Sequence, residues 1–62
     1  MDKPYRVYVD TAPVFGPTSG HWGPTFRDAG DFEVWADNQH IRKGTILRLY
    51  RGEREVSRQT VK

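Results

Sequence analysis

The side chains best suited to recognition chemistry are the basic residues of the C-terminal third of the chain. Residues 41–62 carry five more cationic than acidic side chains, whereas residues 1–40 carry three more acidic than cationic ones. Spaced guanidinium groups bind phosphates and release counterions, and aromatic rings such as those of Tyr50 and Trp35 can stack on bases. The candidate nucleic-acid-binding residues are Arg42, Lys43, Arg48, Tyr50, Arg51, Arg54 and Arg58. The alternative is that these charges only keep a solvated hairpin from aggregating edge to edge. The net charge of the chain, +2, favours this alternative over a nucleic-acid-binding surface.

A second candidate surface lies between residues 11 and 31, where aromatic residues stand among prolines and glycines. This composition resembles that of surfaces that grip peptides, and tryptophan, tyrosine and arginine dominate the hot spots of protein interfaces. The candidate protein-binding residues are Phe15, Trp22 and Phe26. The simpler alternative is that these rings fold back to complete an undersized core, because the rest of the chain offers few large apolar residues.

The sequence shows no clear catalytic or metal-binding pattern. The histidines, His21 and His40, show no spacing with carboxylates that suggests a metal site, and the chain has no cysteine. Ser19 and Ser57 have no neighbouring base, and no glycine array leads into a phosphate loop. We therefore expect a non-enzymatic protein with no metal, no cofactor and no small-molecule substrate.

Three segments show the pattern of β-strands that would position these side chains. Residues 5–10 alternate with period two, which puts residues 5, 7 and 9 on an apolar face and Arg6, Tyr8 and Asp10 on the other. Residues 31–36 and 45–51 are the second and third such segments. The last strand, residues 55–60, is nearly all polar, as an edge strand protected by charge would be. A helix over residues 52–62 is the alternative, but it offers too few apolar residues for a core-facing stripe.

Two turns are expected to connect the later strands. Asp37–Asn38 predicts a two-residue hairpin, and Gly52–Glu53 fits a type II′ turn with glycine at its first central position. The expected cross-strand pairs of the first hairpin are Val34–Ile41, Glu33–Arg42 and Trp35–His40. Those of the second hairpin are Arg51–Arg54, Tyr50–Glu55, Leu49–Val56 and Arg48–Ser57. This register puts Arg58 on the face of Arg51 and Arg54, and Arg48 with Tyr50 on the opposite face.

Residues 11–31 interrupt the strand pattern. Pro13, Pro17 and Pro24 alternate with four glycines, a density that argues against any helix or long central strand. A structureless loop of about 20 residues is uncommon in a compact domain. We therefore expect either a functional loop or a short irregular strand around residues 22–26.

Together these elements predict one small all-β domain over residues 1–62. The expected architecture is an antiparallel meander or partly open barrel of four to five short strands, SH3-like or OB-like, with a long Pro/Gly-rich loop after the first strand. Such a chain builds a marginal core, which a partner subunit is one way to stabilise. No apolar run approaches the ~18 residues that span a bilayer, and residues 1–4 lead into no signal-peptide segment. We therefore expect no membrane association and a cytoplasmic location.

Two functions from different classes follow from these patterns. Small size and near-neutral charge slightly favour an interaction module that binds a protein partner, as a homodimer or as a regulator of a larger complex. The alternative is a β domain that binds DNA or RNA through its basic C-terminal hairpin.

Overall fold

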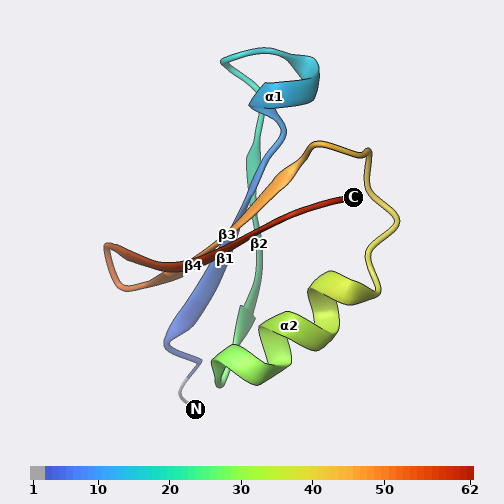
Figure 1. The fold of residues 1–62 in the computed structure, drawn as a ribbon. Helices are drawn as coiled ribbons and strands as arrows, with labels where there is room; N and C mark the ends of the chain where they lie inside the picture. The colour runs from blue at the N-terminus through green and yellow to red at the C-terminus, as the bar shows by residue number, and fades with distance from the viewer. Residues whose placement is uncertain (1–2) are drawn as a thin grey trace.

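A four-stranded antiparallel sheet with one helix packed on it forms the body of the protein in the computed structural model (Figure 1). The structure describes residues 3–62, so Met1 and Asp2, which count in the N-terminal charge, lie outside the described residues. The elements in chain order are β1 (Tyr5–Asp10), α1 (Ala12–Phe15), β2 (His21–Phe26), α2 (Ala29–Asp37), β3 (Ile46–Arg51) and β4 (Arg54–Thr60). The expected small fold with an antiparallel sheet is confirmed, but the protein is mostly β and not all-β, because it also contains α1 and α2.

The strands lie in the order β2-β1-β3-β4 across the sheet. Both β2 and β3 run antiparallel to β1, so they are parallel to each other. Parallel strands need a crossover connection, and α2 with its flanking loops supplies it. Because β2 and β3 are not neighbours, the connectivity is not a simple meander, and the sheet is open with β2 and β4 at its edges.

The core lies between α2 and the face of the sheet that it covers. Alternation along β1 and β3 points every second side chain at the helix, which confirms the apolar face expected for residues 5–10. The fully or nearly buried apolar residues are Val7, Val9, Phe26, Phe32, Ala36, Leu47 and Leu49. Tyr5, Trp35, Ile41 and Val61 pack around them, half-buried.

Residues 31–36 are helical, so the prediction of a strand there is wrong. Asp28 caps the helix, because its Oδ1 accepts a hydrogen bond from the Asp31 backbone N–H at 2.9 Å. Phe32 and Ala36, one turn apart, are buried against the sheet, while Val34 is 64% exposed. The predicted hairpin at residues 37–38 is wrong for the same reason, since the backbone N–H of Asn38 closes the helix on Trp35.

The proline- and glycine-rich stretch is not one long loop. The expectation of no helix there is wrong, because the stretch holds α1 and the start of α2. Pro13 lies in the first turn of α1, where its missing N–H leaves no bond unmade. The stretch also holds β2, which confirms the short irregular strand expected near residues 22–26. Pro24 is tolerated in β2 because that strand is an edge, and the pairing with β1 shifts register between Arg6 and Tyr8.

The hairpin of β3 and β4 forms as predicted at its tip. Gly52 has φ +67°, and no non-glycine residue described has a positive φ, which agrees with a type II′ turn. The pairs Arg51–Arg54 and Tyr50–Glu55 are confirmed. A bulge beyond them replaces the other two expected pairs by Leu49–Ser57 and Arg48–Arg58, and leaves Val56 exposed. Residues 54–60 form an edge strand, so the alternative helix is wrong.

Candidate functional site

The face of the sheet opposite α2 carries the polar and amphipathic half of each strand. Arg6 and Tyr8 on β1 alternate with the buried valines, and Arg48 and Tyr50 on β3 alternate with the buried leucines. α1 lies beyond the strand ends and not over this face (Figure 1). We call this surface the open face. It consists of the polar residues of β1 and β3 named above, Trp22 of β2, and Glu55 and Arg58 of β4.

Trp22 is the centre of an aromatic cluster on the open face. Cross-strand pairing sets it opposite Tyr8, and its indole reaches over β1 to Tyr50 on β3. The ring centroids of Trp22 lie 5.0 Å from Tyr8 and 5.4 Å from Tyr50, both edge to face. The guanidinium carbon of Arg6 lies 4.2 Å from the centre of the Trp22 ring. Trp22 nevertheless stays 47% exposed, so the cluster is a surface feature and not a second core.

Glycine lets β2 lie close enough for this cluster to form. A Cβ at position 23 would come within 2.9 Å of Cγ1 of Val7, inside the range real Cβ atoms avoid. Only a glycine at position 23 lets β2 lie this close to β1 without displacing the core. The position of the neighbouring Trp22 over β1 therefore depends on Gly23.

A hollow of about 460 Å³ lies beside the aromatic cluster. This volume falls in the range of small ligand pockets. Its lining residues are Arg6, Tyr8, Trp22, Tyr50, Gly52 and Glu53. The hollow is thus walled by three aromatic rings and ends at the β3–β4 turn.

A chain of ion pairs fills the rest of the open face. Arg48 donates from Nε and Nη2 to Oδ2 of Asp10, at 3.0 and 2.8 Å, and from Nη1 to Oε1 of Glu55 at 3.0 Å. Arg58 donates to Oε2 of Glu55 at 2.9 Å. These contacts join β1, β3 and β4 and neutralise most of the charge between them.

The same hydrogen bonds shift the ionisation of all three central groups. The pKa of Asp10 is lowered, first by the backbone N–H of Ala12, which donates to its carboxylate, and then by Arg48. The pKa of Glu55 is lowered by the hydrogen bonds from Arg58 and Arg48. The pKa of Arg48 is raised by its bonds to Asp10 and Glu55.

The residues predicted to bind nucleic acid do not gather on one surface. Arg48 and Arg58 are held by carboxylates on the open face, and the bulge in β4 puts Arg58 on the face of Arg48 and not, as expected, on that of Arg51. Tyr50 lines the hollow.

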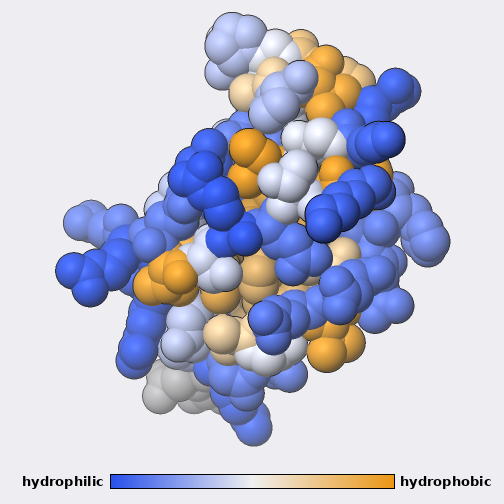
Figure 2. Space-filling model, in the orientation of Figure 1, coloured by the Kyte–Doolittle hydropathy of each residue, from blue (hydrophilic) through white to orange (hydrophobic). Residues whose placement is uncertain are grey.

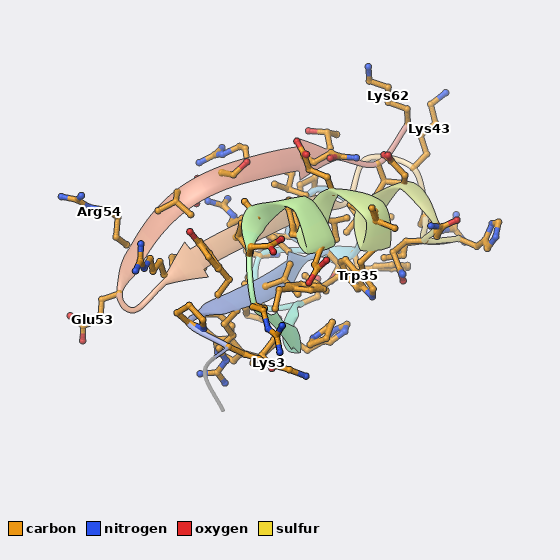
Figure 3. The ribbon with its side chains drawn as sticks, turned by 90° about the horizontal axis from the view of Figure 1, so that it is seen from below. Lys3, Trp35, Lys43, Glu53, Arg54 and Lys62 are labelled. Atoms are coloured by element: carbon orange, nitrogen blue, oxygen red, sulfur yellow. The ribbon has the colours of Figure 1, made fainter. Side chains whose placement is uncertain are left out.

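The remaining predicted cations lie at the two ends of the molecule. Arg54 lies at the tip of the hairpin opposite Arg51, whose guanidinium is 5.6 Å from the ring centre of Tyr5. Lys43 lies at the other end, beside Lys62 (Figure 3). Arg42 lies 5.6 Å from the ring centre of Phe15.

The three residues predicted to bind protein occupy different environments. Phe26 is 8% exposed and packs in the core against Phe32 and Trp35. Phe15 is 62% exposed on α1, where hydrophobic side chains gather at one end of the surface (Figure 2). Trp22 alone of the three lies on the open face. Trp35, proposed as a stacking ring, packs from α2 against Phe26 and Phe32 instead.

Sequence reasoning missed Arg6 and Tyr8 as site residues. The signal was present, because the alternation of residues 5–10 put both on the polar face of β1. Trp22 was predicted as a binding residue, but its contacts with Arg6 and Tyr8 were not, because they depend on pairing between β1 and β2.

Other features of residues 3–62 bear less on function. No group of three metal-ligating side chains lies together in that part of the chain, and none of its helices is long and apolar enough to cross a membrane. The hydroxyl of Thr45 is buried without a hydrogen-bond partner among these residues.

The chain matches no protein-family model, and no curated protein or solved structure is significantly similar to it.

Proposed function

We propose that this domain is a non-enzymatic interaction module that binds a protein partner through its open face. The observation that carries the proposal is the cluster of Tyr8, Trp22 and Tyr50 with Arg6, which lies half-exposed beside a hollow. Tryptophan, tyrosine and arginine are the residues most enriched in interface hot spots, where they anchor the contact near its centre.

The charge of the open face supports a protein over a nucleic acid. Binding to phosphates requires cations that can exchange their counterions. Arg48 already makes three hydrogen bonds to carboxylates, and Arg58 is bonded to Glu55. Partly exposed aromatic rings beside charges that are already paired agree better with a protein interface, which has an aromatic-rich centre and a polar rim.

Single-stranded nucleic acid is the second candidate, and one observation favours it. Tyr8 and Tyr50 lie on the two central strands of an open four-stranded sheet, an arrangement by which some RNA-binding sheets stack bases. Such binding would weaken steeply as salt rises. A closer likeness to SH3-like or OB-like domains and a cytoplasmic location also stay predictions.

Site-specific photo-crosslinking tests the face directly. A photoreactive residue replaces Glu53, at the rim of the hollow, or Val34, which is exposed on α2 on the other side of the sheet. In nuclease-treated extract we expect a protein adduct from position 53 and none from position 34. Trp22→Ala should abolish the adduct, whereas Phe15→Ala, which removes an exposed aromatic ring elsewhere, should leave it. Equal adducts from both positions, or adducts that nuclease removes, would contradict the proposal.

A further inference from the structure

The geometry of the rings in the hollow points to the kind of segment that fits there. Trp22 meets Tyr8 at an interplanar angle of 71° and Tyr50 at 65°. Rings that stand edge to face present both edges and faces to the hollow, and not one flat platform. Arg6 already covers one face of the indole, which leaves less of it for a stacked base.

We propose that the hollow binds an extended, proline-containing peptide segment with a basic residue lying next to Glu53. This inference rests on the proposed function and names the chemistry of the partner. Proline-rich segments in the polyproline II conformation dock into aromatic-lined grooves.

The hydrogen-bonding capacity of the hollow agrees with this partner. A polyproline II helix makes no internal hydrogen bonds, so its carbonyl groups are free to accept. Trp22 and Tyr50 line the hollow, and neither the indole N–H nor the phenol hydroxyl has a hydrogen-bond partner within residues 3–62.

A small contact area also favours a preordered ligand. The hollow has six lining residues, so it offers few contacts to offset the entropy of ordering a flexible chain. Proline fixes φ before binding, which lowers that entropic cost. A flexible peptide of the same size would bind less tightly for this reason.

Glu53 gives the segment its charge preference. It lines the hollow at the β3–β4 turn and makes no ion pair within the described residues. Its side chain diverges from that of Arg54 at the tip of the hairpin (Figure 3). A lysine or arginine at one end of the bound segment would meet this carboxylate.

Nitrogen-15 NMR of the whole chain tests the inference, because the two indole N–H groups act as reporter and control. Trp22 lines the hollow, whereas Trp35 packs against the core on the other side of the sheet. The probes are a proline-rich peptide with a terminal arginine, the same peptide with glutamate in place of arginine, and one with alanine in place of every proline. We expect the arginine peptide to shift the Trp22 resonance saturably and to leave that of Trp35 in place.

The peptides and variants separate the parts of the inference. The arginine peptide should bind about 2- to 5-fold more tightly than the glutamate peptide, as one exposed ion pair gives. Glu53→Arg, an exposed turn position, should reverse that order without affecting the fold. Tyr50→Ala, which removes a ring from the hollow but keeps the Trp22 reporter, should abolish the saturable shift, and Phe15→Ala should leave it intact.

Three results would overturn the inference. The first is a Trp22 resonance that no peptide moves, or that the alanine peptide moves as much as the proline peptide. The second is a shift with a thymidine oligonucleotide alone, which would assign the face to nucleic acid. The third is a shift on concentration alone, which would assign it to a second copy of the chain. If position 53 crosslinks to a protein but no proline peptide shifts the Trp22 resonance, the open face still binds a protein and the inference of a proline-containing segment is wrong.

Discussion

Arg6 on β1 lies over the indole of Trp22 on β2, with 4.2 Å between the guanidinium carbon and the centre of the ring. The two residues come from strands that pair through an irregular register. Their contact fixes the tryptophan against the sheet while leaving it 47% exposed. The ring is therefore held in place before any partner arrives, which lowers the entropic cost of binding.

Arg6→Ala should weaken the domain modestly, because it removes a cation–π contact at an exposed site. Such contacts contribute about 0.5–1 kcal/mol. Urea unfolding followed by circular dichroism measures the loss, and Arg6→Lys, which keeps a cation, should recover part of it. A loss of several kcal/mol would mean that Arg6 has a structural role beyond this contact.

Gly23→Ala should lower the free energy of unfolding more than Arg6→Ala does, although it adds only one methyl group. That methyl would lie 2.9 Å from Val7 and force the core or β2 to move. Overpacking of this kind costs about 1–3 kcal/mol, measured as the free energy of unfolding. Gly30→Ala in α2 is the control, because a Cβ there would meet only a side-chain oxygen of Asp28, at 3.3 Å, which a small shift can relieve. Equal losses for both variants would contradict the close packing of β2 on Val7.

Acid should destabilise the domain through the ion pairs of the open face. The pKa of Asp10 and that of Glu55 are lowered in the folded state from their ordinary 3.8 and 4.5. The stability that these carboxylates give is thus fully present above those ordinary values and is lost as pH falls through the lowered ones. Denaturant unfolding between pH 7 and pH 2 should show a plateau followed by a fall on the acid side.

The variant Asp10→Asn separates the two contacts of that side chain. Asparagine can still accept the hydrogen bond from the backbone N–H of Ala12, but it carries no charge for Arg48. The fall in stability on the acid side should therefore be shallower in Asp10→Asn than in the natural chain. An unchanged acid limb would show that Asp10 does not titrate in this transition.

The helix α2 predicts opposite outcomes for two apolar residues that a strand would place on one face. Phe32→Ala should cost about 3–5 kcal/mol and unfold so small a domain, because Phe32 is 1% exposed. Val34→Lys should change stability by less than about 0.5 kcal/mol, because Val34 is 64% exposed. Thermal unfolding of both variants tests this. Comparable losses would favour the strand.

The same segment shows why part of the fold could not be predicted from sequence. Phe32, Val34 and Ala36 alternate as in a strand, yet Phe32 and Ala36 are also one helical turn apart. Two features favour the helix. Asp28 caps its N-terminus, and Phe32 and Ala36 bury the apolar face of the sheet when the segment is helical. The strands β1 and β3 were predictable because alternation over six residues fits no helix.

The candidate site divides in the same way. The alternation of β1 and β3 predicted that Arg6 with Tyr8, and Arg48 with Tyr50, each share a face. The contacts of Trp22 depend on pairing across strands, and those of Arg58 on the bulge at Val56. A single extra residue in a strand moves every later side chain to the opposite face, and no local pattern announces it.

Two charge reversals on β4 should have opposite effects, because the bulge separates their environments. Arg54 lies opposite Arg51, so Arg54→Glu replaces a repulsive pair by an attractive one and should stabilise the hairpin by about 0.2–1 kcal/mol. Arg58 is bonded to Glu55, so Arg58→Glu should destabilise it. The two variants have the same net charge, which makes each the control for the other. Both effects should shrink in high salt, because the groups are exposed. Effects of the same sign in urea unfolding would mean that net charge, and not these pairings, governs the stability of the hairpin.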